Sequence, residues 1–163
     1  MANEISKYLL NQFVEMHTWV NMYIEPLTDD ELKLEFAEGK SHGVWILGHL
    51  IKYENDISVY MGKGNVLYPV YDELFGTGSK LLPVENYPSI PLLRKQWKEV
   101  IEKNKKIYSE LTDEELKQPH GKIENPEKDF FKTKERVAMF WHLHSMYHAG
   151  QFSAIIAKAG KTV

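Results

Sequence analysis

The sequence predicts an all-α protein, a four-helix bundle formed by a single domain over residues 1–163. Four long segments carry apolar residues at steps of three and four, the spacing of one helix face. No alternating pattern of useful length indicates a competing strand. Two similar connections, LTDDEL at 27–32 and LTDEEL at 111–116, repeat a helix–turn–helix plan. Together these observations favour two related helical hairpins packed as one bundle.

The first two helices are expected at residues 3–24 and about 41–61. Helical periodicity covers the first segment, and Pro26 stops it. The second segment opens with HGVWILGHLI, which is apolar almost all round and therefore typical of a buried helix. Gly62 follows it as a break.

The other two helices are expected from about Ser89 to Tyr108 and from about Thr133 to Gly160. Ser89 is a plausible N-cap, and Pro91 is tolerated in a first turn. Gly160 is a good terminating glycine. In the repeated plan, the helices at 41–61 and 133–160 occupy equivalent places, so functional residues on them should face each other.

The connections differ in what they suggest. Each of the repeated turns has a threonine cap followed by acidic residues in a first turn. The long 62–88 connection holds aromatic residues and glycines but no regular pattern, which favours a lid or binding loop. We expect 118–130 to be a surface loop with a solvated His120, and the lysine-rich 98–106 to be a solvated helix face.

Composition excludes several functions. The net charge is -3 with a pI near 6.2, so nucleic acid and anionic membranes are poor partners. The absence of cysteine excludes disulfides, thiolate ligands and a cysteine nucleophile, and fits a reducing compartment. Acids and amides interrupt the apolar residues of the N-terminal segment, which therefore resembles neither a signal peptide nor a membrane span. We expect a cytoplasmic protein.

The stretch HLHSMYHAGQ at 142–151 contains three histidines. At about 100° per residue, His144 and His148 lie within about 40° of each other, and Gln151 lies beside them. His142 falls about 160° away, on the side expected to face outward. The expected buried stripe around His144 also contains Val137, Phe140, Trp141, Tyr147 and Ile155.

Two histidines one helical turn apart can direct their rings at a single cation. A catalytic site needs a third ligand, and His49 is the best candidate because it lies on the buried partner helix. Its face also carries Trp45, Tyr53, Asp56 and Tyr60. His17 is the competing third ligand, and His42 is expected to serve only the start of its helix.

The alternative to a metal site is a pair of hydrogen-bonded core histidines, although two adjacent buried imidazoles would each need partners. Other kinds of site have less support in the sequence. The chain lacks the E-x-x-H repeats of di-iron bundles and the H-E-x-x-H of zinc peptidases. The segment LFGTGSK lacks the spacing and ending of a P-loop.

Two segments, SHGVWILGHLIKYE and HSMYHAGQ, resemble the two signatures of the DinB-like (YfiT-like) superfamily of metal-binding four-helix bundles. The resemblance spans nearly the whole chain, and H-x-x-x-H-x-G-Q is its more specific motif. It implies that His49, His144 and His148 bind one divalent metal, with Gln151 supporting the ligands or the packing. Many relatives have an arginine where this chain has Ala149.

The resemblance also implies chemistry. Characterised relatives are mostly transferases or isomerases that use low-molecular-weight thiols such as bacillithiol or mycothiol, and others are described as metal-dependent hydrolases. The leading expectation is therefore a metal-dependent thiol S-transferase acting on a small-molecule electrophile. Zinc or nickel is the first choice of metal, with iron or manganese as alternatives. A homodimer is expected, as is common in the family.

Two alternatives to the S-transferase stay open. A hydrolase would use water in place of the thiol, with Asp56 as a proton carrier. A non-catalytic, metal-stabilised stress-related protein is the third hypothesis.

Overall fold

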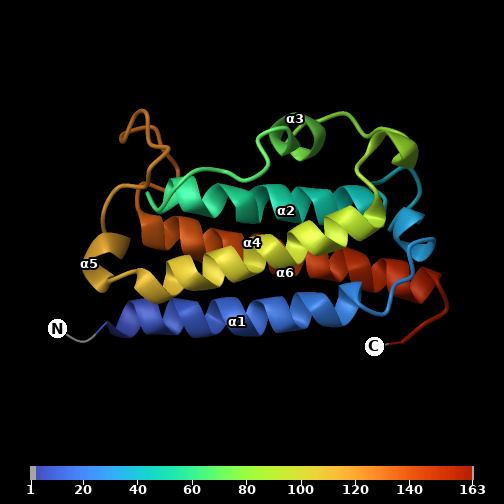
Figure 1. Cartoon of the computed structure of the whole chain (residues 1–163), viewed down its shortest axis with the longest axis horizontal. Coiled ribbons are helices and arrows are strands. Elements are labelled where there is room, and N and C mark those ends of the chain that lie inside the picture. Colours follow the sequence, from blue (N-terminus) through green and yellow to red (C-terminus); the bar gives the residue numbers. More distant parts are fainter. Residues whose placement is uncertain (1–2, 163) are drawn as a thin grey trace.

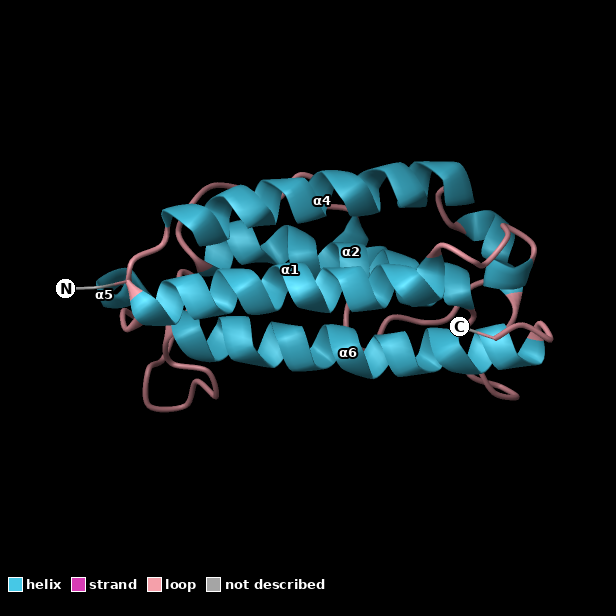
Figure 2. Ribbon diagram, turned by 90° about the horizontal axis from the view of Figure 1, so that it is seen from below, coloured by secondary structure: helices cyan, strands magenta, loops and turns pink. Residues whose placement is uncertain are grey.

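The computed structural model describes residues 3–162, whose four long helices lie side by side as a bundle (Figures 1 and 2). The long helices are α1 (Glu4–Ile24), α2 (Gly43–Tyr60), α4 (Ile90–Glu110) and α6 (Lys134–Lys158). The short elements are η1 (Glu31–Lys33), α3 (Tyr71–Phe75), η2 (Val84–Asn86) and α5 (Asp113–Leu116). Residues 3–162 contain isolated bridges but no strand, so the all-α prediction is confirmed.

The four long helices do not simply alternate in direction along the chain (Figure 1). α1 and α6 run one way along the bundle, and α2 and α4 run the other way (Figure 1). α1 packs against α6 and α4, while α2 packs against α4 and α6. The chain therefore brings α2 and α6 into contact, as the repeated plan predicted.

Local sequence explains where the elements begin and end. At the second repeat, Thr112 and Glu115 form a reciprocal capping box at the start of α5. At the first, Thr28 and Glu31 exchange the same pair of hydrogen bonds before η1. Gly160 follows α6 with a φ of 72°, the left-handed conformation that typically ends a helix. Both threonine caps and the terminating glycine were predicted.

The 62–88 connection contains regular structure, contrary to the prediction. Its short helix α3 lies against α2 on the outside of the bundle (Figure 1). The close fit depends on Gly48, because an ideal Cβ there would lie 2.2 Å from Cε1 of Phe75. The buried Phe75 ring also stacks on Tyr87, which ties the later part of the loop to the same place.

The prediction that His120 is solvated is wrong. The side chain is buried because the 118–130 loop folds back over it. Its Nε2 lies 2.9 Å from Oδ1 of Asp129, and its Nδ1 accepts a hydrogen bond from the Lys122 amide. The imidazole also packs against the ring of Tyr60.

The predicted orientation of α6 needs a second correction. His142 is buried, not outward-facing, because that flank of α6 packs on α1, where its Nδ1 lies 2.9 Å from Oε1 of Gln12. Conversely, Phe140 and Tyr147 are exposed, although both were placed in the buried stripe. The helix buries two flanks, against α1 and α2, so the centre of its core face lies away from His144. Within the described residues no helix has the length and hydropathy of a membrane span.

Candidate metal centre

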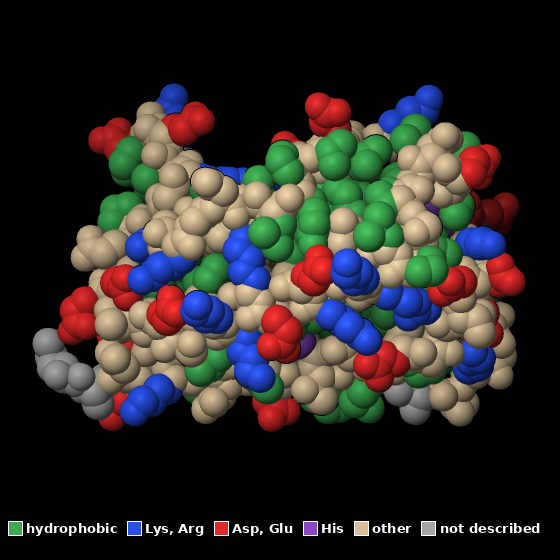
Figure 3. All heavy atoms as spheres, in the orientation of Figure 1, with side chains coloured by type: hydrophobic (Ala, Val, Ile, Leu, Met, Phe, Trp, Pro, Cys, Tyr) green, Lys and Arg blue, Asp and Glu red, His purple; other side chains and the backbone are tan. Residues whose placement is uncertain are grey.

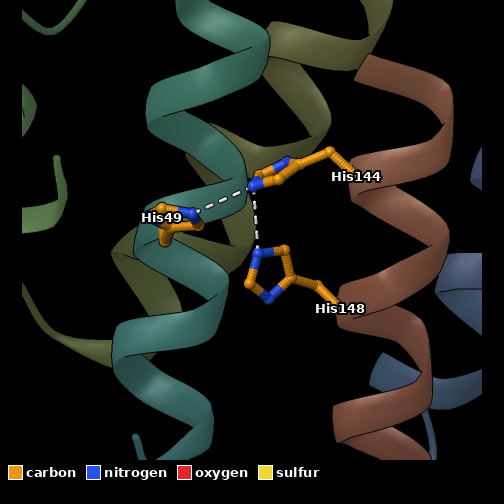
Figure 4. Close-up of side chains that lie close together, drawn as sticks. All are labelled: His49, His144 and His148. Atoms are coloured by element: carbon orange, nitrogen blue, oxygen red, sulfur yellow. Dashed lines mark hydrogen bonds between the residues drawn. The ribbon is translucent and has the colours of Figure 1, made fainter. Parts of the chain in front are cut away.

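Three histidines from two helices converge at one point. His49 projects from α2, and His144 and His148 project from α6 toward it (Figure 4). The Nε2 atom of His144 lies 3.1 Å from Nε2 of His49 and 3.1 Å from Nε2 of His148. Among the described residues, these three form the one group of potential metal-ligating side chains whose ligand atoms all lie within 4.8 Å of one another.

Neighbouring oxygens fix the orientation of two of these rings. Nδ1 of His49 lies 2.6 Å from the carbonyl oxygen of Phe75, and Nδ1 of His148 lies 2.6 Å from Oε1 of Gln151. Since a carbonyl oxygen only accepts, each Nδ1 carries the proton and donates it. Each Nε2 is then left with a lone pair directed at the meeting point, which is the tautomer that a metal ligand needs.

The local electrostatics keep the imidazoles uncharged near neutral pH. Burial lowers the pKa of His49 to about 4. Burial, together with the neighbouring His148 and His49, lowers the pKa of His144 to about 3. Burial also lowers the pKa of His148, partly offset by its bond to Gln151. Neutral imidazoles can coordinate a cation without first losing a proton.

The donor set fits a divalent ion. Three nitrogens bound to one tetrahedral ion at the usual distance would lie about 3.3 Å apart, close to the two 3.1 Å separations here. Without a cation, Nε2 of His144 could donate a proton to Nε2 of only one of its two neighbours. Its contact with Nε2 of the other histidine would then lack a hydrogen bond, and the electron density of the two nitrogens would repel. The buried Nδ1 of His144 has no hydrogen-bond partner. The group includes no carboxylate. Three neutral ligands would therefore leave a bound ion with its full positive charge.

Aromatic side chains wall the histidines. The ring of Trp45 stacks on the imidazole of His49 with 4.5 Å between ring centroids, and the ring centroid of Tyr53 lies 4.4 Å from that of His144. Trp45 Nε1 donates to Oγ of Ser79, and the Tyr53 hydroxyl is hydrogen-bonded to Thr77. The chain that follows α3 is therefore anchored to both walls of the site.

The structure does not bring Asp56 to the histidines. Its carboxylate pairs with Lys52 at 3.1 Å and with Lys122 at 2.9 Å. These residues line a separate cavity of about 300 Å³, to which Asp72 also contributes. Lys52 also forms an ion pair with Asp72 at 3.0 Å. The two lysines and two aspartates of this cavity therefore balance in charge. A proton-carrying role for Asp56 stays a prediction.

The other histidines serve different purposes. His42 is the N-cap residue of α2, where its Nδ1 accepts a hydrogen bond from the Trp45 amide, as expected for a residue that serves the helix start. His17, the competing third ligand, lies elsewhere in the core, with its Nε2 3.4 Å from Oε1 of the buried Glu54. Asn104 donates to the other oxygen of Glu54 at 2.7 Å.

Sequence reasoning missed two features, a buried carboxylate elsewhere in the core and a backbone carbonyl at the metal site. The buried Glu54 was detectable, because its helical position falls among apolar residues of α2. Burial alone would raise its pKa, but the facing His17 and the bond from Asn104 lower it on balance. The carbonyl oxygen of Phe75 left no signal, because backbone atoms are the same at every residue.

An all-α bundle with three convergent histidines on two adjacent helices defines a class of candidate metal-binding helical proteins. The model of the DinB superfamily matches residues 12–152, and the chain belongs to that superfamily. The matched segment includes all three histidines. No curated protein sequence matches the chain.

Solved structures share the fold. One is YfiT from Bacillus subtilis, described as a probable metal-dependent hydrolase with an unusual four-helix bundle topology. It is 15% identical, with a TM-score of 0.66 over 99% of this chain and 91% of that chain. A conserved protein from Enterococcus faecalis is 13% identical, with a TM-score of 0.68 over 96% of this chain and 99% of that chain. At these identities the likeness shows the fold alone.

Proposed function

We propose that the protein is a metal-dependent enzyme that transfers a low-molecular-weight thiol to a small electrophilic substrate. His49, His144 and His148 hold one divalent ion, with zinc or nickel as the first candidates and iron or manganese as alternatives. The observation that carries the proposal is the convergence of three neutral imidazole nitrogens without a carboxylate.

The charge of the ligand set favours an anionic cosubstrate. When bound, a divalent ion acts as a Lewis acid that lowers the pKa of a coordinated thiol or water. Because the histidines bring no negative charge, they leave the ion its full attraction for a thiolate. The chain has no cysteine, so the sulfur must come from a separate molecule. A reducing cytoplasm would supply such thiols, which agrees with the expected localisation.

The reaction itself balances simply. The thiol gives its proton to solvent, its sulfur forms a bond to the electrophilic carbon, and the leaving group departs with its bonding electrons. The residues of the chain contribute orientation: Gln151 and the Phe75 carbonyl hold two of the rings in place. The rings of Trp45 and Tyr53 offer apolar walls for the substrate and reduce the access of water.

Conjugation to monochlorobimane tests the proposal. Metal-loaded protein is incubated with bacillithiol, mycothiol or glutathione, and the fluorescent conjugate is compared with the rate without protein. We expect conjugation with at least one thiol, its loss in His144→Ala and its retention in His42→Asn. Asparagine is a preferred N-cap residue, so this control keeps the start of α2 while it removes an imidazole. No conjugate above background with any thiol would sink the proposal.

A metal-dependent hydrolase is the second candidate. The description of YfiT from Bacillus subtilis favours it. Among the described residues the histidine group includes no carboxylate that could accept the proton of water, so a coordinated water, like the thiol, would lose its proton to solvent. A hydrolase would turn over activated esters without added thiol, and His144→Ala would abolish this activity.

A further inference from the structure

The cavity beside α2 is lined by charged side chains that take no part in holding the metal. Its walls come from α2, from the 66–69 segment, from the first turn of α3 and from Lys122 of the 118–130 loop. Figure 3 shows the surface hollowed between α3 and the 118–130 loop, along the upper edge of the molecule. We call this space the α2 cavity. Its volume of about 300 Å³ is large enough for one end of a small molecule.

The ammonium groups of the α2 cavity outnumber its buried carboxylates. The side chain of Asp56 is 8% exposed, and its Oδ2 lies 3.1 Å from Nζ of Lys52 and 2.9 Å from Nζ of Lys122. The second carboxylate belongs to Asp72, whose side chain is 76% exposed, so that water and salt screen its charge. The buried part of the cavity therefore has a positive charge in excess, which favours an anionic group of a ligand.

Both lysines can turn a donor toward such a group. An ammonium has three N–H donors. Nζ of Lys122 pairs with Asp56 and lies 5.0 Å from the ring centroid of Tyr60, which leaves a donor for a ligand. Nζ of Lys52 pairs with Asp56 and with the exposed Asp72, so a carboxylate of a ligand can replace Asp72 beside it.

The α2 cavity lies within reach of the three histidines. His49 and Asp56 are seven residues apart on α2, which places them on one face about 10 Å apart. The ring of Tyr53 lies between them, with its centroid 4.6 Å from that of His49 and 4.5 Å from Nζ of Lys52. Trp45 lies one turn on the other side of His49. A molecule with its sulfur at the histidines can therefore extend along Tyr53 to the cavity and leave the side of Trp45 to the electrophile.

We propose that the α2 cavity binds a carboxylate of the thiol cosubstrate, held between Lys52 and Lys122 about 10 Å from the sulfur. The inference rests on the proposed thiol transfer, and it adds a preference for thiols that bear a carboxylate at that distance. The electrophile needs no charge, because the side chains expected around it are aromatic. Asp56 acts in this account as a positioning residue that keeps the two ammonium groups in place.

Titration of zinc-loaded protein with succinate tests the cavity without any reaction. The side-chain amide of Asn55 reports binding in nuclear magnetic resonance spectra, because Asn55 lines the cavity. Lys122→Met removes the charge but keeps the length of the side chain, and should weaken succinate binding by about 10-fold or more, the worth of a hydrogen bond to a charged group. The matched control, Lys128→Met, removes an exposed lysine of the same loop and should bind succinate as wild type does.

Asp72→Asn should change the affinity in the opposite direction. It removes the carboxylate that competes for Lys52, so succinate should bind more tightly than to wild type. This variant decides the question alone if Lys122→Met does not fold, since Asp72 is an exposed side chain. No shift of the Asn55 amide signals, an equal affinity in a folded Lys122→Met, or weaker binding to Asp72→Asn would overturn the cavity as a carboxylate site.

Steady-state conjugation to monochlorobimane tests which molecule brings the carboxylate. Lys122→Met should raise the KM for the thiol by about 10-fold or more and change kcat by less than about twofold, the pattern of lost ground-state binding. Mycothiol, which has no carboxylate, should be a poorer cosubstrate than bacillithiol and glutathione, which have them. An unchanged KM for the thiol, a KM that rises for monochlorobimane instead, or a preference for mycothiol would overturn the assignment to the thiol. If succinate binds as expected and no thiol is conjugated, the proposed function fails and the carboxylate site stands without it.

Discussion

Gly48→Ala tests how the loop beyond α2 positions the metal-binding side chains. The added Cβ would lie 2.2–2.5 Å from three carbons of the Phe75 ring, which is fully buried and cannot simply move into solvent. Overpacking of this kind typically costs about 1–3 kcal/mol. Alanine returns about 1 kcal/mol through its higher helix propensity. We therefore expect a net loss of up to about 2 kcal/mol in the free energy of unfolding, with the clash the larger effect.

The same substitution should weaken metal binding. The ring and the carbonyl of Phe75 belong to one residue, and the carbonyl accepts the Nδ1 proton of His49. Displacing the ring shifts that carbonyl and releases the imidazole from its fixed orientation. Loss of a partner that orients a metal ligand typically costs about 10–100-fold in affinity.

Thermal denaturation and metal titration of Gly48→Ala measure the two effects. A drop in melting temperature of about 4–8 °C corresponds to a loss of about 2 kcal/mol in a chain of this size. Gly48→Ala combined with Phe75→Leu is the control, because leucine lacks the ring carbons that meet the new Cβ. In a protein that already carries Phe75→Leu, Gly48→Ala should lower the free energy of unfolding by less than it does in wild type. A Gly48→Ala protein that is more stable than wild type and binds metal equally well would refute this reasoning.

Three further predictions concern the buried polar groups. Glu54→Ala should lower the free energy of unfolding by about 3 kcal/mol, because it leaves His17 without its buried carboxylate; a loss below about 1 kcal/mol in urea denaturation would contradict this. Gln151→Ala should weaken metal binding by about 10–100-fold, because it frees the Nδ1 proton that the amide oxygen holds; calorimetric titration would show an unchanged affinity if the contact were unimportant. Burial lowers the pKa of His49 to about 4 and that of His144 to about 3, from ordinary values near 6.5, so below pH 6.5 the unfolded chain binds more protons than the folded one. The stability of the metal-free protein should therefore be greatest above pH 6.5 and fall as the pH drops to about 4, and a urea midpoint that is equal at pH 7.5 and pH 5 would argue against buried neutral imidazoles.

Much of the fold was predictable because its signals are local. The apolar spacing located the four long helices to within a few residues, and threonine caps marked two of the turns. The repeat of those turns correctly placed α2 against α6. That placement singled out His49 as the residue to face His144 and His148, and the structure brings the three together.

The failures have two physical causes. The prediction assumed that α6 has one buried face and one polar face. On that assumption His142 was expected to face outward and Tyr147 to face inward. α6 packs on two neighbours, and from residue 137 to residue 157 it contains no Asp, Glu, Lys or Arg, so its sequence gives no such contrast. His120 was misplaced because the fold of an irregular loop depends on contacts with distant residues, such as Tyr60. The hydrogen bond to the Phe75 carbonyl depends on a loop path that local spacing does not encode.

Elemental analysis of purified protein tests the central claim most directly. After loading with zinc or nickel and removal of free ions, wild type should retain one ion per chain. His49→Ala and His148→Ala should each lose it, whereas His42→Asn should keep it because that imidazole only caps α2. Equal metal content in wild type and both alanine variants, or none in wild type, would contradict the assignment of His49, His144 and His148 as the ligands of a metal centre.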